Sequence, residues 1–322
     1  MDDATIATQP IRAQTSLRRR LLWLLVIGAL VIGVTIVWRY FRYARPIGVG
    51  PAGPSVNREL FAANWSDRPV VLLGLGDSVT QGLGASPGCA YFNRLVKNPA
   101  NEFTDMQGIC LSKVLPHLEP LNLSISGTTS IECLDYELPK LKPYDKDVFG
   151  IVVMTTGGND VIHNYGRTPA REGAMFGAKV NEIAEWVKNF DQRLDTIASR
   201  VREAFPGGCQ IFIANIYDPT DGDGDTQGAG LPAWPDGVKV LQAYNEVLVR
   251  FDERHDDVQL IDMRSAFLGH GIHCTHFWHR TYHQADPYYW YWDNLEDPND
   301  QGYDAIRRLF LNEIARTVPG KL

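Results

Sequence analysis

The sequence predicts an α/β fold, a three-layer α/β/α sandwich around a five-stranded parallel sheet, preceded by one transmembrane helix. Short apolar runs rich in β-branched residues alternate with long segments in which apolar residues recur every three or four positions. A single uncharged apolar run lies near the N-terminus. Alternating strands and helices indicate parallel pairing, because each helix returns the chain to the same edge of the sheet.

Five apolar runs are the expected strands, at residues 70–75, 121–125, 148–155, 210–216 and 258–263. The clearest expected helices lie between or after them, at residues 178–205, 234–253 and 301–317. Folds of this class place their functional groups beyond the carboxyl ends of the strands. The residues that follow each predicted strand are therefore the first candidates for a site.

The N-terminal run, residues 21–38, contains neither a charge nor a proline. As a helix it is about 27 Å long, close to the roughly 30 Å hydrocarbon core of a bilayer. The aromatic and basic stretch WRYFRY follows it, without the small-residue cleavage site of a signal peptide. We therefore expect a retained, single-pass signal anchor. The arginines 18–20 favour a cytoplasmic N-terminus, with the body of the protein on the extracytoplasmic side.

The predicted domain plan has four parts: an N-terminal tail (1–20), the transmembrane anchor (21–38), a linker (39–66) and one globular domain (67–322). Residues 1–45 carry seven arginines against two aspartates, so the remaining chain has a net charge of −12. This acidity excludes nucleic acid as a partner, because nucleic-acid binding needs a basic surface. Five cysteines fit either compartment, and in an oxidising one Cys89 and Cys110 are a candidate pair.

Three residues at successive strand ends form a candidate active site. Ser78 follows the first strand, Gly127 the second and Asn159 the third. A serine at a strand-to-helix turn exposes its hydroxyl, whereas a glycine N–H and an asparagine amide can stabilise an oxyanion. Each residue alone is also an ordinary cap or turn residue. Their convergence on one serine favours a catalytic interpretation.

The ordered blocks GDSV, Gly127 and GGND resemble the SGNH (GDSL) hydrolase superfamily of esterases and lipases, over roughly residues 70–315. The resemblance implies a flavodoxin-like fold, Ser78 as the nucleophile, and an oxyanion hole made by the Ser78 and Gly127 N–H groups and the Asn159 side chain. It also implies an ester substrate and no cofactor, since water hydrolyses the acyl-enzyme.

The fourth block departs from the superfamily pattern, which reads Asp-x-x-His-Pro-Asn followed by a glycine. Here Asn294 stands at the aspartate position and Asp297 at the histidine position. The general base is therefore missing from its usual place. Five histidines precede this block, and we expect His270, between two glycines near the last strand, to be the base. His273 is the second candidate and Asp297 the third, because an ordinary carboxylate is a weak base at neutral pH.

The segment with the five histidines has other interpretations. One is a solvated insertion, and another is a zinc site made by His273, His276 and His283 with Cys274, although the spacing fits no specific zinc motif. Residues 218–225 resemble a calcium loop but lack its glycine and its final glutamate. No metal is predicted.

We assign substrate-binding roles to Asp77 and Asp160 beside the nucleophile and to Trp290 in an aromatic stretch. The predicted activity is hydrolysis of a carboxylic ester of a lipid, an acetylated glycan or a small molecule. The alternatives are a carbohydrate-binding protein that lost its base and an O-acyltransferase that passes the acyl group to a sugar.

Overall fold

The structure, a computed structural model, describes residues 12–162 and 176–322. Two compact units are present, Met1–Ala44 and Arg45–Leu322. In the first, helix α1 (Arg12–Tyr43) contains the predicted anchor and continues through the aromatic flank. Within its stretch Arg18–Tyr43, the most apolar window of 18 residues has a mean hydropathy of 2.7 and no buried part. This helix is therefore long and apolar enough to cross a membrane or to act as a signal sequence.

The second unit contains the predicted sheet. Its five parallel strands run in the order β2-β1-β3-β4-β5. They are β1 (Val70–Gly76), β2 (Leu118–Asn122), β3 (Phe149–Thr155), β4 (Cys209–Ala214) and β5 (Val258–Ile261). Every residue of β1 and β3 is buried, as expected for central strands covered on both faces. The predicted fold class is confirmed.

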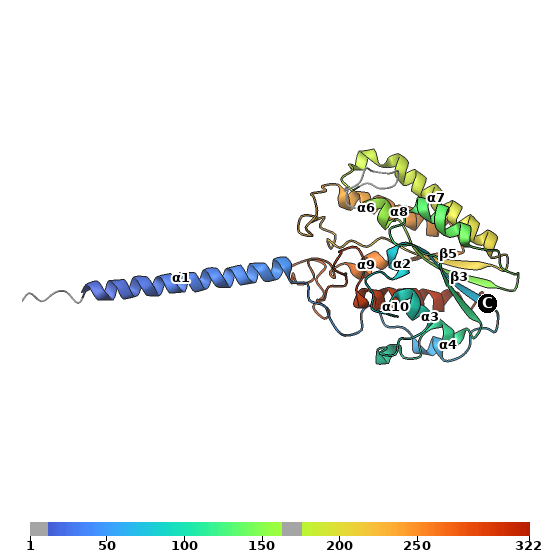
Figure 1. Cartoon of the computed structure of the whole chain (residues 1–322), viewed down its shortest axis with the longest axis horizontal. Coiled ribbons are helices and arrows are strands. Elements are labelled where there is room, and N and C mark those ends of the chain that lie inside the picture. The colour runs from blue at the N-terminus through green and yellow to red at the C-terminus, as the bar shows by residue number, and fades with distance from the viewer. Residues whose placement is uncertain (1–11, 163–175) are drawn as a thin grey trace, which may run out of the picture. The chain divides into compact units, whose positions relative to one another are not determined.

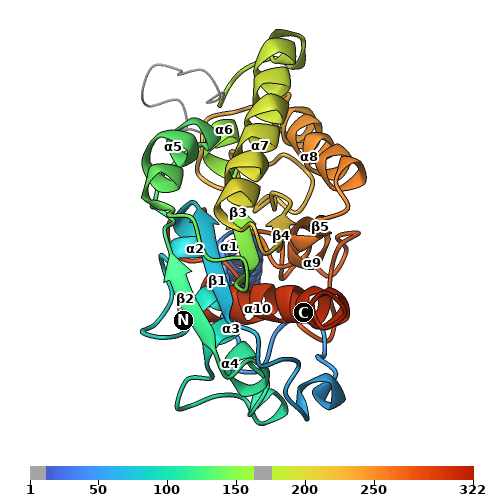
Figure 2. The same ribbon diagram turned by 90° about the vertical axis from the view of Figure 1, so that its right-hand side faces the viewer.

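Helices cover both faces of this sheet (Figures 1 and 2). On one face lie α7 (Ala184–Ala204) and α8 (Gly237–Arg254), and on the other lie α3 (Tyr91–Val96), α4 (Leu111–Val114) and α10 (Asp300–Thr317). Alternate strand residues supply the two cores: Leu72 packs with the α3 and α10 side, and Leu73 with the α7 and α8 side. This period of two is the pleat of a strand.

Strand β2 begins and ends earlier than predicted, at 118–122 and not at 121–125. The apolar run misled the prediction because β2 is an edge strand with a largely exposed beginning that contains Glu119 and Pro120. Beyond its end, the N–H groups of Leu123 and Ile125 still donate hydrogen bonds to carbonyls of β1. The residues leading to Gly127 therefore remain attached to β1, the strand that precedes Ser78.

The expected linker is largely part of the folded unit, which begins at Arg45 and not at residue 67. Ala52 is buried, and its N–H donates to Asp304 Oδ2 at 3.1 Å. The Gly48 N–H likewise donates to Gln301 Oε1 at 2.8 Å. This Pro/Gly-rich stretch lacks helix and strand, yet it packs against α10.

All five cysteines are buried free thiols, so Cys89 and Cys110 form no disulfide in this structure.

Candidate active site

Ser78 lies where β1 turns into the short helix α2 (Ser78–Gln81). The turn requires glycine at position 76, where φ is +105° and a Cβ atom would stand 1.7 Å from the Thr155 carbonyl oxygen. Asp77 caps the helix, with its Oδ1 accepting the Val79 N–H at 3.1 Å. The serine is thus held on the first helical turn, where backbone N–H groups lack helical partners.

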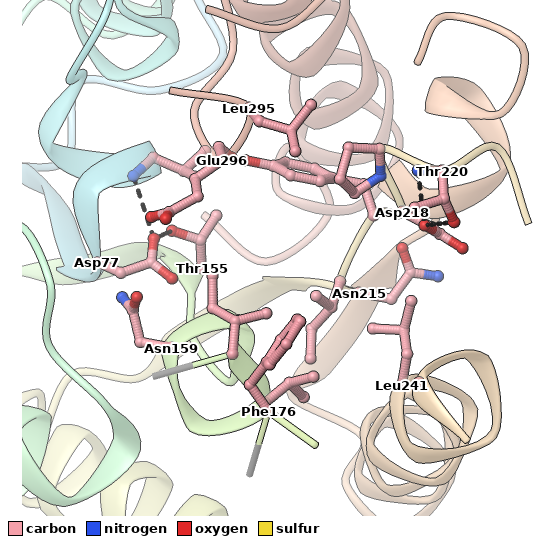
Figure 3. A pocket seen from close by; sticks show the side chains of 18 of the residues that line it. Asp77, Thr155, Asn159, Phe176, Asn215, Asp218, Thr220, Leu241, Leu295 and Glu296 are labelled. Atoms are coloured by element: carbon pink, nitrogen blue, oxygen red, sulfur yellow. Dashed lines mark hydrogen bonds between the residues drawn. The ribbon is translucent and has the colours of Figure 1, made fainter. Parts of the chain in front are cut away.

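A cavity opens beside this turn, with an empty volume of about 1000 Å³ including its mouth. Asp77, Thr155 and Asn159 lie at one end, and Asp218 and Thr220 at the other (Figure 3). Most of the wall between them is apolar and is made by Val161, Ile162, Phe176, Ile216, Leu231, Trp234, Val238, Leu241, Met263 and Leu295. Ser78 therefore stands at the edge of a space that suits an apolar group.

The residue at the histidine position, Asp297, faces Ser78. Its carboxyl is almost fully buried, and burial raises its pKa while hydrogen bonding with Ser78 and Asn294 lowers it. The contact with Ser78 is loose, since Asp297 Oδ1 has no partner of standard hydrogen-bond geometry. Loose contacts of this kind are common in ligand-free active sites. The fourth block thus brings a carboxylate, in place of an imidazole, to the serine hydroxyl.

Asn294 holds this carboxylate in place. Its amide donates to Asp297 Oδ2 at 2.5 Å, and its Oδ1 accepts the Glu296 and Asp297 N–H groups at 3.2 and 3.0 Å. Leu295, inside this turn, has a left-handed backbone with φ of +70°. A leucine rarely adopts this conformation, so the surrounding bonds impose it. The turn leaves one oxygen of Asp297 for the serine.

A second carboxyl, Asp77, lies in the same acidic environment. The pKa of Asp77 is raised to about 7, chiefly by burial, which outweighs the hydrogen bonds from Thr155 and Val79 that lower it, and in smaller part by the charges of Asp297 and Glu137. The Thr155 bond measures 2.7 Å. The charge of the neighbouring Asp297 therefore contributes to the raised pKa of Asp77.

The predicted oxyanion donors lie on neighbouring loops. Asn159, on α6 (Gly158–Ile162), lines the cavity, and its amide donates to the Thr128 carbonyl at 3.0 Å. This bond ties it to the turn that contains Gly127, where φ is +83°. Gly127 itself is not among the described residues that line the cavity. This hydrogen bond thus joins the start of α6 to the Gly127 turn.

The sequence analysis does not predict Glu137, which bonds both the end of β1 and the turn that contains Gly127. It is completely buried, and its Oε2 accepts the Gly76 N–H at 2.7 Å while its Oε1 accepts the Thr128 hydroxyl at 3.0 Å. Burial raises the pKa of Glu137. It connects the end of β1 to the Gly127 turn, and no pattern around Glu137 in the sequence indicates this contact.

His270, the expected base, lies elsewhere. Its Nδ1 bonds the Tyr288 carbonyl at 3.0 Å, and its ring stacks on Trp290 with the centroids 3.5 Å apart. Burial lowers the pKa of His270 to about 4, and none of its contacts is with Ser78. Trp290 is only 2% exposed and, like His270, does not line the cavity. These contacts give neither residue its predicted role.

Asp160 also has its hydrogen bonds occupied within the protein. It is completely buried and accepts the Ser130 N–H at 2.8 Å and the Ser130 hydroxyl at 2.5 Å. Its Oδ1 also lies 3.6 Å from Nη2 of Arg193. These contacts fix α6 to α5 (Ser130–Glu132). Of the three predicted substrate-binding residues, the structure places Asp77 alone in the cavity wall.

Residues 75–305 match the sequence model of the GDSL-like Lipase/Acylhydrolase family, a stretch that includes Ser78, Asn159 and Asp297. The chain belongs to this family. It is therefore a member of the SGNH hydrolase superfamily, as the sequence blocks predict. The family match covers the nucleophile turn and the altered fourth block within one continuous domain.

Several solved structures are similar to this GDSL-like protein. An extracellular lipase from Streptomyces rimosus is 14% identical, with 75% of this chain and 98% of that one covered and a TM-score of 0.49. The acetylxylan esterase Axe2 from Geobacillus stearothermophilus is 16% identical, with 77% and 96% covered and a TM-score of 0.47. A phospholipase A1 from Streptomyces albidoflavus is 18% identical, with 74% and 97% covered and a TM-score of 0.47. No curated protein matches the chain.

Proposed function

We propose that this GDSL-like protein hydrolyses carboxylic esters through an acyl-enzyme on Ser78. The observation that carries the proposal is the pairing of Ser78 with the buried carboxyl of Asp297 at the edge of the cavity. The Ser78 oxygen attacks the ester carbonyl carbon, and the alcohol leaves as the tetrahedral intermediate collapses. Water then attacks the acyl-Ser78 carbonyl, releases the acid and restores the serine.

Asp297 takes the place of the missing histidine in this mechanism. It accepts the Ser78 proton during attack, gives it to the departing alcohol, and later accepts a proton from the hydrolytic water. A carboxylate with a raised pKa is a better base than an ordinary one. Asn294 orients it, and the N–H groups of Ser78 and Gly127 with the Asn159 amide are the proposed donors to the oxyanion.

The cavity favours an acyl chain of several carbons over an acetyl group. Most of its wall is made by apolar side chains, Val161 and Leu241 among them. Burial of each methylene group of an acyl chain in such a space contributes about 0.8 kcal/mol to the binding free energy. Among the three ester classes considered above, this supports a lipid-like ester. Thr220 and Asp218 at the far end set the polar limit of the apolar space.

A fluorophosphonate probe tests the assignment of the nucleophile. We expect the full chain, purified in detergent, to be labelled on Ser78, and the Ser78→Ala variant to remain unlabelled. Ser199→Ala, which removes an exposed hydroxyl on α7, is the matched control and retains labelling. A folded wild-type protein that does not react supports the alternative of a carbohydrate-binding protein. Release of the acyl group to a sugar in preference to water supports the acyltransferase.

We also propose that α1 is a retained anchor that holds the domain on the extracytoplasmic side. The support is the unburied apolar stretch Arg18–Tyr43 with arginines 18–20 at its start. The protein then stays in membranes through alkaline carbonate extraction, and protease added outside the cell digests the domain. A shortened chain in the soluble fraction indicates a cleaved signal sequence instead.

A further inference from the structure

A cluster of metal-ligating side chains lies outside the cavity, where the histidine-rich segment meets the loop after β4. His273 and His279 from the first and Asp223 from the second each offer one ligand atom, and these atoms lie within 4.8 Å of one another. A span of that size is compatible with coordination of a single ion. None of these side chains has a role in the proposed hydrolysis.

The contacts within the cluster are close. His279 Nε2 lies 2.7 Å from Asp223 Oδ2, and His273 Nε2 lies 3.5 Å from Asp225 Oδ2. The rings of His273 and His279 stack with centroids 5.0 Å apart, and His276 lies 4.8 Å from His273 on another side. Three imidazoles from residues 273–279 and two carboxylates from residues 223–225 therefore gather in one place.

His273 gives an independent indication of a ligand. It is only 8% exposed, and its Nδ1, which lies 3.8 Å from Asp221 Oδ2, is buried without a hydrogen-bond partner. A buried polar atom without a partner is costly, so its presence calls for an explanation. His279 has the opposite arrangement: its Nδ1 bonds the Thr281 hydroxyl at 2.7 Å, and this fixes the ring with Nε2 toward Asp223. Metal-binding histidines usually have such an outer partner.

Asp221 holds the backbone around His273 in position through three hydrogen bonds. Its Oδ1 accepts the N–H groups of Gly269 and Gly271, and its Oδ2 accepts the His273 N–H, each at 2.8 Å. These bonds fix the backbone of His273 against the aspartate loop before any ion arrives. Ligands held in position by other contacts bind with a smaller loss of conformational entropy.

We propose that His273, His279 and Asp223 bind one Zn²⁺ ion, with Asp225 or water completing a tetrahedron. Two imidazoles with carboxylate oxygen are typical zinc ligands. Calcium fits less well, because it takes oxygen ligands and the carboxylate of Asp221 is already occupied by backbone N–H groups. This set shares only His273 with the alternative zinc site considered from the sequence, since His276, His283 and Cys274 are not members of the cluster.

The ion would join the histidine-rich segment to a wall of the cavity. Thr220, Gly224 and Thr226, which flank Asp223 in the loop, line that cavity. Zinc bound on the other side of the loop would therefore hold the wall in place without touching the substrate. The zinc proposal does not depend on the proposed hydrolysis.

Isothermal titration of ZnCl₂ into the full chain, purified in detergent without a histidine tag and treated with chelator, tests the site. We expect one Zn²⁺ per chain. His279→Gln and Asp223→Asn should each weaken binding by more than about tenfold, because changes even in outer partners cost 10–100-fold. The control is His255→Gln, which removes a histidine paired with Asp195 at 2.9 Å outside the cluster.

Thermal unfolding in chelator shows whether the variants are folded, and a rise in Tm on adding zinc should occur in the wild type and the control only. Absence of zinc binding to the wild type overturns the proposal. Binding of equal affinity in His279→Gln and Asp223→Asn also overturns it, since the ion would then lie elsewhere. In either case the 2.7 Å contact between His279 and Asp223 is an ordinary hydrogen bond.

Discussion

The Asn294 amide donates a 2.5 Å hydrogen bond to Asp297 Oδ2, and so orients the carboxylate that faces Ser78. In the superfamily pattern these two positions hold an aspartate that accepts from a histidine. Here the direction of the bond is reversed, because an amide donates to a carboxylate. One hydrogen bond between residues three apart is retained, and the proposed base is a carboxyl group of raised pKa.

Asp297→Asn should lower kcat/KM for a p-nitrophenyl ester by about 10²–10⁴-fold, the usual contribution of a general base. The amide has nearly the same shape but cannot accept the Ser78 proton. Asp293→Asn, an exposed neighbour in the same block, is the matched control and should retain full activity. Steady-state kinetics with a thermal melt of each variant measure this.

His270→Gln is the comparison that decides between the two bases. We expect it to keep its activity, because its ring contacts Tyr288, His283 and Trp290 and not the serine. A large loss in folded His270→Gln, together with an active Asp297→Asn, would return the role of base to the histidine.

The stability of the protein should fall as pH rises from about 4 to about 7, in part because of Asp77. Its folded pKa is about 7, against about 3.9 for an unfolded chain. In that window Asp77 has lost its proton in the unfolded chain but retains it in the folded one. Rising pH therefore stabilises the unfolded state relative to the folded state. At about 1.36 kcal/mol per pKa unit, the effect is at most roughly 4 kcal/mol.

Asp77→Asn should remove the part of this loss of stability that comes from Asp77. The free energy of unfolding of the variant should therefore increase relative to that of the wild type as pH rises. Urea unfolding at several pH values between 4 and 8 measures the difference. Asp67→Asn, at an exposed position, should follow the wild-type curve. Parallel curves for Asp77→Asn and the wild type would show that Asp77 titrates as an ordinary carboxyl.

The sequence predicted the fold and the place of Ser78 and Asn159, because both follow buried strands whose carboxyl ends meet at one edge of the sheet. The sequence ranks His270 above Asp297 as the base, whereas the structure places Asp297, and not His270, beside Ser78. The basicity of a carboxyl depends on burial, which raises the pKa of Asp297. His270 is close to β5 along the chain, yet its ring turns to Trp290.

Glu137 and the segment near Ala52 show the same limit. Ala52 is buried by contacts with α10, some 250 positions later, and its Pro/Gly-rich surroundings are typical of a linker. Glu137 contacts Gly76 and Thr128, and neither contact leaves a periodic or motif signal in the sequence. Contacts between residues so far apart in the sequence depend on how the helices and strands pack against one another.

Glu137→Ala should destabilise the protein by about 1–3 kcal/mol, because it leaves the buried Gly76 N–H without an acceptor. It should also lower esterase activity, since the Gly127 turn loses its bond to the end of β1. Glu137→Gln retains one acceptor oxygen and should lose less of both. Glu132→Gln, at the partly buried cap of the neighbouring helix α5, is the control. Urea unfolding measures the stability, and unchanged stability of Glu137→Ala would contradict a structural role.

Leu241→Phe should shorten the acyl chain that the enzyme accepts. Leu241 projects into the apolar part of the cavity, and a phenyl ring there occupies space that a long acyl chain would fill (Figure 3). We expect kcat/KM for a long-chain p-nitrophenyl ester to fall by about tenfold or more, with little change for the acetate, since each methylene in such a pocket is worth about 1–3 kcal/mol. Leu241→Met, which conserves volume, is the matched control. An equal fall for both esters would mean that the chain does not enter this cavity.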